Sequence, residues 1–304
     1  MGVFYQMKFT KRKGFGDRID ADIIRGLDGL HVIMPLMMKN RTDNEAFLRI
    51  SVETEKLDAW LRAKNDANPE HRYTIFQAVL AAVGRTVQMR PRMNTFIKGD
   101  RYYQRNSIQF SFIAKKAFSD AGEEAVAIMD YDPESTKSSI DEMHDKLCSF
   151  VYDLRHNDKT DATTDIIGSL NKLPFFVFRF VIWLLSWLDN HGIMPKALLK
   201  EDPYASTVFL SNLGSLKLDA GYHHLANWGT NSVFIILGEE GRAEVMEPDG
   251  SKRLTSKIDM GITLDERIAD GYYFAKTGRL IKYLLTNPEL LDKPCCEEII
   301  YEEP

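Results

Sequence analysis

The sequence has few cysteines, no excess of basic residues and no apolar run of membrane-spanning length. Its cysteines are Cys148, Cys295 and Cys296, and no Cys-x-x-Cys pair occurs. We therefore expect no metal site, no redox motif and a reduced, cytoplasmic setting. The net charge of −5 argues against nucleic acid as a partner. The N-terminal residues carry lysines but no apolar stretch, so no signal peptide is expected.

Hydrophobic periodicity predicts helices that alternate with strands and hairpins. Residues 26–38 contain "LHVIMPLMM", which we interpret as a strand interrupted at Pro35. Turns at Gly99-Asp100 and Asp249-Gly250 each join two strands. Helices are expected at 54–65, 74–91, 138–156 and 270–285. This order predicts an α/β fold, a two-layer sandwich with a mixed β-sheet.

The longest apolar segment, Leu173 to Leu188, reads "LPFFVFRFVIWLLSWL". Its 16 residues are too few for a membrane crossing, which needs about 20. Apolar side chains occupy every side of the helical wheel, so the helix should be covered by something. It could be buried in the domain, buried between subunits, used as a wall for an acyl chain, or placed in a membrane interface.

Four stretches, in order, resemble the catalytic domain of the dihydrolipoamide acyltransferases, a fold shared with chloramphenicol acetyltransferase. They are "TIFQAVLAAVGRTVQMRPRMNTFI" (74–97), "SIQFSFIAKK" (107–116), "STVFLSNLGSL" (206–216) and "DERIADGYYFAKTGRLIKYLLTNPELL" (265–291). The last is similar to the family's D-H-R-x-x-D-G box, followed by a helix. We call residues 265–271 the box.

The resemblance implies one CoA-dependent acyltransferase-like domain over residues 1–304, with an enlarged apolar helical insertion at about 157–204. It also implies a homotrimer with active sites between subunits. The co-substrate would be a coenzyme A thioester or an acyl-carrier thioester, with no covalently bound cofactor. Apart from the resemblance, a peripheral membrane contact through residues 173–188 stays one of the open roles of the apolar segment in a protein expected to be cytoplasmic.

The family places a base, an oxyanion donor and a bracing aspartate at fixed motif positions. Ser211 matches the oxyanion donor and Asp270 the bracing aspartate, while Asp265 and Arg267 match the other charged residues of the box. The catalytic histidine position holds Glu266. Glutamate, with a reference pKa of about 4.3, is a weak base for a thiol of about 8.5 unless burial raises its pKa.

Three interpretations of Glu266 therefore remain open. It is a tuned base, or another residue supplies the base, or the domain is a catalytically degenerate protein that binds or scaffolds. His223 and His224 are candidates for a substitute base, because a neutral imidazole has a pKa near 6.5. Packing in a turn is the alternative role for this pair. The sequence thus predicts acyl transfer to an unknown acceptor, with a binding or scaffold protein as the alternative.

Overall fold

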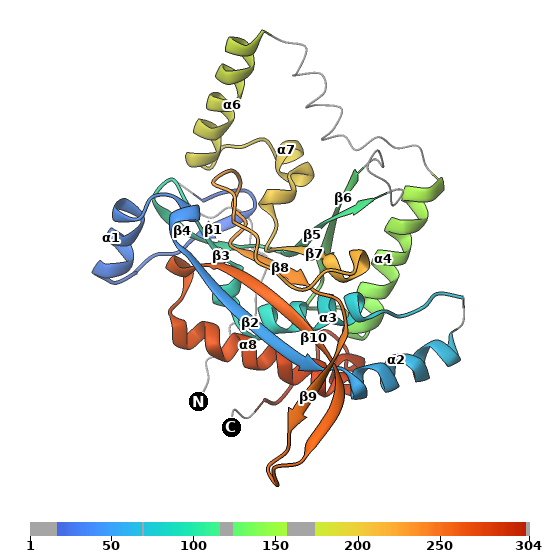
Figure 1. The fold of residues 1–304 in the computed structure, drawn as a ribbon. Helices are drawn as coiled ribbons and strands as arrows, with labels where there is room; N and C mark the ends of the chain where they lie inside the picture. The colour runs from blue at the N-terminus through green and yellow to red at the C-terminus, as the bar shows by residue number, and fades with distance from the viewer. Residues whose placement is uncertain (1–16, 69, 116–123, 157–173, 302–304) are drawn as a thin grey trace.

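A seven-stranded mixed β-sheet forms the centre of the computed structural model, which describes residues 17–68, 70–115, 124–156 and 174–301 (Figure 1). Its strands follow the order β2-β10-β8-β7-β5-β6, and β9 pairs with β10. The β5–β7 and β7–β8 pairs are parallel, and the others are antiparallel. A second sheet has the order β1-β4-β3. The strands are β1 (Ala21–Ile23), β2 (Glu45–Glu53), β3 (Thr95–Lys98), β4 (Arg101–Arg105), β5 (Ile108–Lys115), β6 (Glu124–Tyr131), β7 (Val208–Asn212), β8 (Val233–Leu237), β9 (Gly241–Met246) and β10 (Lys252–Asp265).

Helices cover one face of the large sheet and form the second layer. Helix α3 packs against β5, α8 against β2 and α2 against β10, while α3 also contacts α4 and α8. The main core lies between these layers, where Leu80, Phe110 and Leu284 are fully buried. This arrangement confirms the predicted α/β sandwich with a mixed sheet. The helices are α1 (Gly29–Met37), α2 (Glu55–Ala67), α3 (Ile75–Met89), α4 (Ser139–His156), α6 (Phe175–Asn190), α7 (Lys196–Glu201) and α8 (Gly271–Thr286).

The opposite face of the large sheet is crossed by a coil, residues 217–232, which we call the strap. It follows β7 and leads into β8. The strap lies so close to β10 that a Cβ at Gly261 would stand 1.9 Å from the Gly221 carbonyl oxygen. Only glycine therefore fits at position 261 without moving the backbone. The rings of Phe209 and Phe234 stack on this face at 4.9 Å, and Leu225 of the strap packs with them.

The strand expected at residues 26–38 is wrong, because most of this segment forms helix α1. The Asp28 side chain caps the helix by accepting hydrogen bonds from the amides of Leu30 and His31, at 3.0 Å each. Such a cap satisfies amides that have no partner within the helix. Pro35 lies inside this helix and does not end it.

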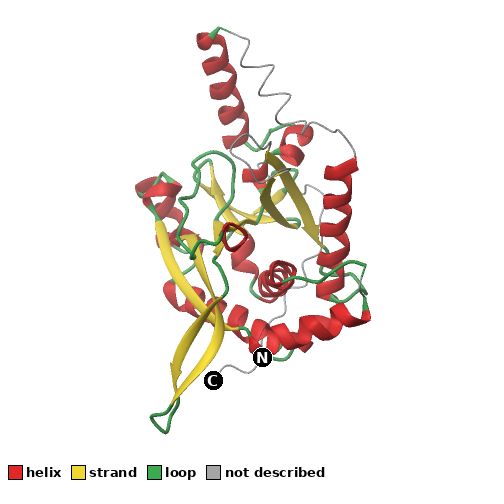
Figure 2. Cartoon of the chain, turned by 45° about the vertical axis from the view of Figure 1, so that its right-hand side comes forward, coloured by secondary structure: helices red, strands yellow, loops and turns green. Residues whose placement is uncertain are grey.

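Helices α1 and α6 leave large apolar side chains uncovered. In α6, Phe176 is 74% exposed and Trp183 is 58% exposed, and the helix points away from the body of the protein (Figures 1 and 2). Burial of residues 174–188 within the domain is therefore wrong. Leu173 and residues 157–172 of the predicted insertion lie outside the described residues. Among the described helices, none is both long and apolar enough to cross a membrane.

Candidate functional site

The box begins where β10 ends, at a buried cluster of charged side chains. Asp265, the last residue of β10, is fully buried. It accepts two hydrogen bonds from Arg267, with Nε–Oδ1 at 2.8 Å and Nη2–Oδ2 at 2.7 Å. Arg41 Nε lies 3.5 Å from the same carboxylate. Arg267 also donates to the carbonyl oxygens of Met38 and Lys39, so this pairing fixes the box against the end of α1.

Glu266 is exposed, although both of its chain neighbours are buried. Its backbone amide donates to the carbonyl oxygen of Asn44 at 2.9 Å, which fixes the position of its main chain. No hydrogen bond or ion pair joins its carboxylate to the residues that the structure describes. The side chain is therefore free to meet a substrate or a second copy of the chain.

Asp270 starts helix α8 and caps it. Its carboxylate accepts a hydrogen bond from the amide of Tyr273 at 2.8 Å, and the side chain is exposed. Gly271 follows as the first helical residue, with open space where a Cβ would lie. Within one chain Asp270 therefore orients the start of the helix directly after the box.

Ser211 lies far from Glu266 in the same chain. Ser211 of β7 is in register with Ile236 of β8, which is in register with Gly261 of β10. Glu266 comes five residues after Gly261, which corresponds to about 16 Å along the strand direction, and two strand spacings of about 5 Å separate β7 from β10. The structure thus places the predicted oxyanion donor and the box near opposite ends of these strands.

His223 and His224 lie on the strap. Measured along the strands of the sheet, their position falls between Ser211 and Glu266, because His223 stacks on Phe234 of β8. The His223 ring stacks on Phe234 at 4.3 Å and on His224 at 4.4 Å, and both histidines are exposed. His223 Nδ1 lies 2.7 Å from the carbonyl oxygen of His224, so Nδ1 carries the proton that it donates. In the neutral ring this leaves Nε2 as a proton acceptor. No contact with Ser211 or Glu266 is formed within the described chain.

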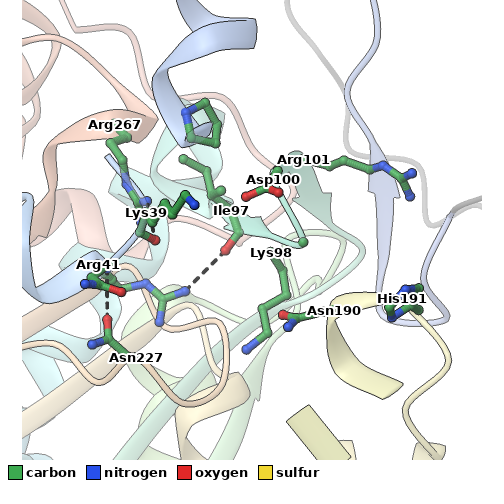
Figure 3. Close-up of a pocket in the computed structure, with 13 residues that line it drawn as sticks. Lys39, Arg41, Ile97, Lys98, Asp100, Arg101, Asn190, His191, Asn227 and Arg267 are labelled. Atoms are coloured by element: carbon green, nitrogen blue, oxygen red, sulfur yellow. Dashed lines mark hydrogen bonds between the residues drawn. The ribbon is translucent and has the colours of Figure 1, made fainter. Parts of the chain in front are cut away.

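A cavity of about 410 Å³ beside the box was not predicted. Lys39, Arg41, Lys98, Arg101 and Arg267 contribute to its lining (Figure 3). Its lysine and arginine residues, apart from Arg267, come from two short stretches of the sequence, "KNR" at 39–41 and "KGDR" at 98–101. Such stretches are common on solvated surfaces, so the sequence alone does not predict a cavity there.

Burial shapes the pKa values of the charged groups behind this cavity. Burial lowers the pKa of Arg41, of Lys98 and of Arg105, the last to about 9. Burial alone would raise the pKa of Asp189, but the positive charges of Arg18 and Lys98 lower it overall. The cluster is therefore costly to bury and is held together by its opposite charges.

The described residues contain no group of three or more His, Cys, Asp or Glu side chains placed to hold a metal ion. The free cysteines also lie apart from the box. Cys295 is buried, Cys148 is half-buried and Cys296 is exposed. The candidate groups among the described residues are the carboxylate of Glu266, the hydroxyl of Ser211 and the imidazoles of His223 and His224, which do not meet within one chain.

Comparison with known proteins identifies the fold. No family model and no curated protein matches the sequence. A probable dihydrolipoamide acetyltransferase from Listeria monocytogenes is similar in structure, with a TM-score of 0.55, 14% identity and coverage of 88% of this chain and 95% of that one. A dihydrolipoamide acetyltransferase from Azotobacter vinelandii, solved to study a serine, a histidine and an asparagine in its catalytic mechanism, has a TM-score of 0.56 at 12% identity, covering 88% and 93%.

A chloramphenicol acetyltransferase is similar as well, with a TM-score of 0.50 at 12% identity and coverage of 87% of this chain and 99% of that chain. At such identities the likeness establishes the fold alone. The chain therefore has the fold of the catalytic cores of the dihydrolipoamide acetyltransferases and of chloramphenicol acetyltransferase.

Proposed function

We propose that the protein transfers an acyl group from a thioester of coenzyme A or of an acyl carrier to an acceptor nucleophile. The observation that carries the proposal is the exposed carboxylate of Glu266, held at the start of the box on a fold that known acetyltransferases share. Glu266 would take the proton of the nucleophile as it attacks the thioester carbonyl, and Ser211 would donate to the oxyanion that forms there. When this adduct collapses, the C–S bond would break and the departing thiolate would take the proton back from Glu266, which leaves a free thiol and the acylated acceptor.

The distance between Ser211 and Glu266 supports a site made by two copies of the chain. Because strand register separates them within one chain, Glu266 of one copy and Ser211 of another would have to meet across an interface. A homotrimer would form three such sites. A second copy would also bury Glu266, and burial is what makes a carboxylate a stronger base. Asp270, at the start of α8, would position the box.

The alternative is a catalytically degenerate protein that binds or scaffolds. Glu266 is exposed in the single chain. If no second copy covers it, its carboxylate stays solvated and is a weak base, which favours this alternative. His223 offers a third arrangement, since the hydrogen bond at its Nδ1 leaves Nε2 as a proton acceptor in the neutral ring. These possibilities make different predictions for single substitutions.

Turnover of acyl-CoA separates the alternatives. Release of thiol from acetyl-, butyryl- and palmitoyl-CoA is followed with and without added thiol and alcohol acceptors. If Glu266 is the base, Glu266→Gln should lower kcat by about 100-fold or more and Glu266→His should retain or raise it. Ser211→Ala should lower kcat by roughly 100-fold. A loss with His223→Gln and not with Glu266→Gln would assign the base to the strap.

The matched control is Glu239→Gln, which removes an exposed carboxylate near the end of β8 and should leave turnover unchanged. No turnover by the wild type, together with no binding of coenzyme A in calorimetry, would contradict the enzyme proposal and leave the binding protein.

Mixing of subunits tests whether two copies form the site. The Ser211→Ala and Glu266→Gln variants are unfolded together in equal amounts and refolded. In a random trimer about a quarter of the sites would then combine an intact serine with an intact glutamate. Activity near that fraction supports the shared site, whereas a mixture as inactive as its components contradicts it.

The exposed face of α6 favours a peripheral membrane contact as an additional role. Phe176, Phe180, Trp183 and Trp187 recur at spacings of four, three and four residues, which places them on one side of the helix. We call these four residues the aromatic stripe. Aromatic side chains suit the boundary between lipid headgroups and acyl chains. The helix spans about 24 Å, less than the hydrocarbon thickness of about 30 Å.

Flotation with liposomes tests this contact. Wild-type protein should float with vesicles of phosphatidylcholine and phosphatidylglycerol, and the Trp183→Ser, Trp187→Ser double variant should remain at the bottom. A Tyr272→Ser variant, which removes an exposed aromatic residue from α8, is the control and should float like the wild type. Wild-type protein that stays at the bottom would contradict the membrane contact.

A further inference from the structure

The basic cavity lies where the C-terminal ends of α1 and α6 meet the turn between β3 and β4 (Figure 3). Lys39 and Arg41 follow α1, Lys98 ends β3, and Arg267 belongs to the box. Asp100 is the one carboxylate among the described residues that line it. The proposed acyl transfer assigns no role to this cavity, so an inference about its ligand stands apart from that proposal.

Two of the arginines at the cavity share a single carboxylate. Arg41 and Arg267 both pair with Asp265, at 3.5 Å and 2.7 Å, and all three side chains are buried. Lys39 adds an exposed ammonium group on the same side of the cavity (Figure 3). The guanidinium of Arg101 points away from this group and belongs to the rim (Figure 3). One side of the cavity thus holds three cations against one buried carboxylate.

The neighbouring ion pairs do not offset this excess. Lys98 and Arg18 both contact Asp189, at 2.9 Å and 2.7 Å. Asp20 supplies Arg18 with a second carboxylate at 2.8 Å. These two carboxylates are in direct contact with Arg18 and Lys98, and Asp189 reaches Arg41 only at longer range. Among the ion pairs of the described residues, Asp265 is the carboxylate that contacts Arg41 and Arg267 directly.

Arg41 is the residue that gains most from a bound anion. It is almost fully buried, and burial lowers its pKa. Its guanidinium donates to the carbonyl oxygens of Ala226 and Ile97, at 2.6 Å and 3.4 Å, while its Nε faces the Asp265 carboxylate at 3.5 Å without closing a hydrogen bond. A guanidinium does not give up its proton near neutral pH, and Arg41 shares the carboxylate that it contacts with Arg267, so an added anion would further stabilise its charge.

We infer that this cavity binds a phosphate group. Phosphate offers several acceptor oxygens that can face cations from different directions, and arginine with lysine is the usual combination that holds it. The volume of about 410 Å³ leaves room for a group larger than one phosphate, such as a pyrophosphate or a phosphodiester with its substituent. Lys39 gives the entering anion its first contact, and Arg41 and Arg267 hold it deeper inside.

Calorimetry with inorganic pyrophosphate tests the inference. We expect saturable binding that weakens as salt is raised, because the contacts are ionic. Lys39→Glu should weaken it on the order of tenfold or more, since reversing this charge opposes the anion. Lys39 is exposed, so the variant should fold like the wild type, which circular dichroism and a melting curve check.

The matched control is Lys56→Glu, an identical charge change at an exposed position on α2. It should bind pyrophosphate as the wild type does. No saturable binding to the wild type, or equal weakening by both substitutions, would overturn the inference.

Competition distinguishes the sources of the phosphate group. Bound pyrophosphate is challenged with coenzyme A in one arm and with phosphatidylglycerol vesicles in the other, each with and without Lys39→Glu. Displacement by coenzyme A alone assigns the cavity to a nucleotide-type phosphate, and displacement by vesicles alone assigns it to a lipid headgroup near α1 and α6. Failure of both to displace pyrophosphate would assign the cavity to free phosphate or pyrophosphate, whether or not acyl transfer is observed.

Discussion

The strand pair β2–β10 has clusters of like charge near both of its ends, and the two ends accommodate them differently. At the box, Arg41 and Arg267 share Asp265. At the other end, Asp58 and Glu240 lie together, with Thr54 donating to Glu240. Burial, a hydrogen bond to Glu240 and the charge of Glu240 together raise the pKa of Asp58 to about 6.

The difference follows from the chemistry of the two kinds of side chain. A carboxylate pair loses its repulsion by binding one proton, so the Asp58 end needs no further partner at mildly acid pH. Two arginines cannot lose a proton in the same way, so the box end relies on backbone carbonyls, on Asp265 and on any anion that enters the cavity. The cation-rich end is therefore the one whose stability should respond to a ligand.

The largest effect should come from removing the shared carboxylate. Asp265→Ala leaves the buried charges of Arg41 and Arg267 without the carboxylate that they share, and we expect a loss of about 3–5 kcal/mol in the free energy of unfolding. Urea denaturation measures it. The control, Glu244→Ala, breaks an exposed ion pair with Lys252 and should cost less than about 1 kcal/mol. Equal losses in the two variants would show that the buried pairing of Asp265 contributes no more to stability than an exposed ion pair.

A smaller effect should come from removing one arginine. Arg41→Met leaves a one-to-one pair of Asp265 with Arg267 but removes the donor to the carbonyl oxygens of Ala226 and Ile97, so we expect a loss of about 1–3 kcal/mol. The double variant with Asp265→Ala should lose less than the sum of the two single losses, because the groups interact. Additive losses would contradict the shared-carboxylate description.

The smallest effect should be a change in pH dependence at the carboxylate end. Asp58 has a raised pKa in the folded protein, so between about pH 4 and pH 6 the folded state binds more protons than the unfolded state. Its contribution to stability is thus present at low pH and is lost as the pH rises through about 6. In Asp58→Asn, the free energy of unfolding should decrease less steeply with pH over that window, as measured by urea denaturation at several pH values. An unchanged slope would contradict the shift.

Local sequence patterns were enough for much of the fold. Helix α3 matches the periodicity of residues 74–91, and its Thr74–Gln77 capping box marks the start. The turns at Gly99-Asp100 and Gly250 have the positive φ angles that such turns require. These features depend on residues close together in the chain, which is why a single sequence reveals them.

The rest depends on contacts between distant residues. The segment that forms α1 is a short apolar run without alternation, and such a run does not distinguish a strand from a helix. The exposure of α6 could not be predicted, because an apolar sequence does not say whether anything covers it. For the site, the motifs located Ser211 and Glu266, but only the register of β7, β8 and β10 reveals their separation. Arg41 and Asp265 meet from opposite ends of the chain, so their pairing left no sequence signal.

The register of β7, β8 and β10 has a consequence for how the protein would behave in dilute solution. A reaction that needs Ser211 and Glu266 from different copies exists only while the copies remain associated. Specific activity should then fall as the protein is diluted below the dissociation constant of the assembly, and substrate that binds across the interface should oppose that fall by mass action. In a plot of total activity against protein concentration, the curve would bend upward at low concentration and become straight once the copies are fully associated. The concentration at which it becomes straight would measure the dissociation constant of the assembly.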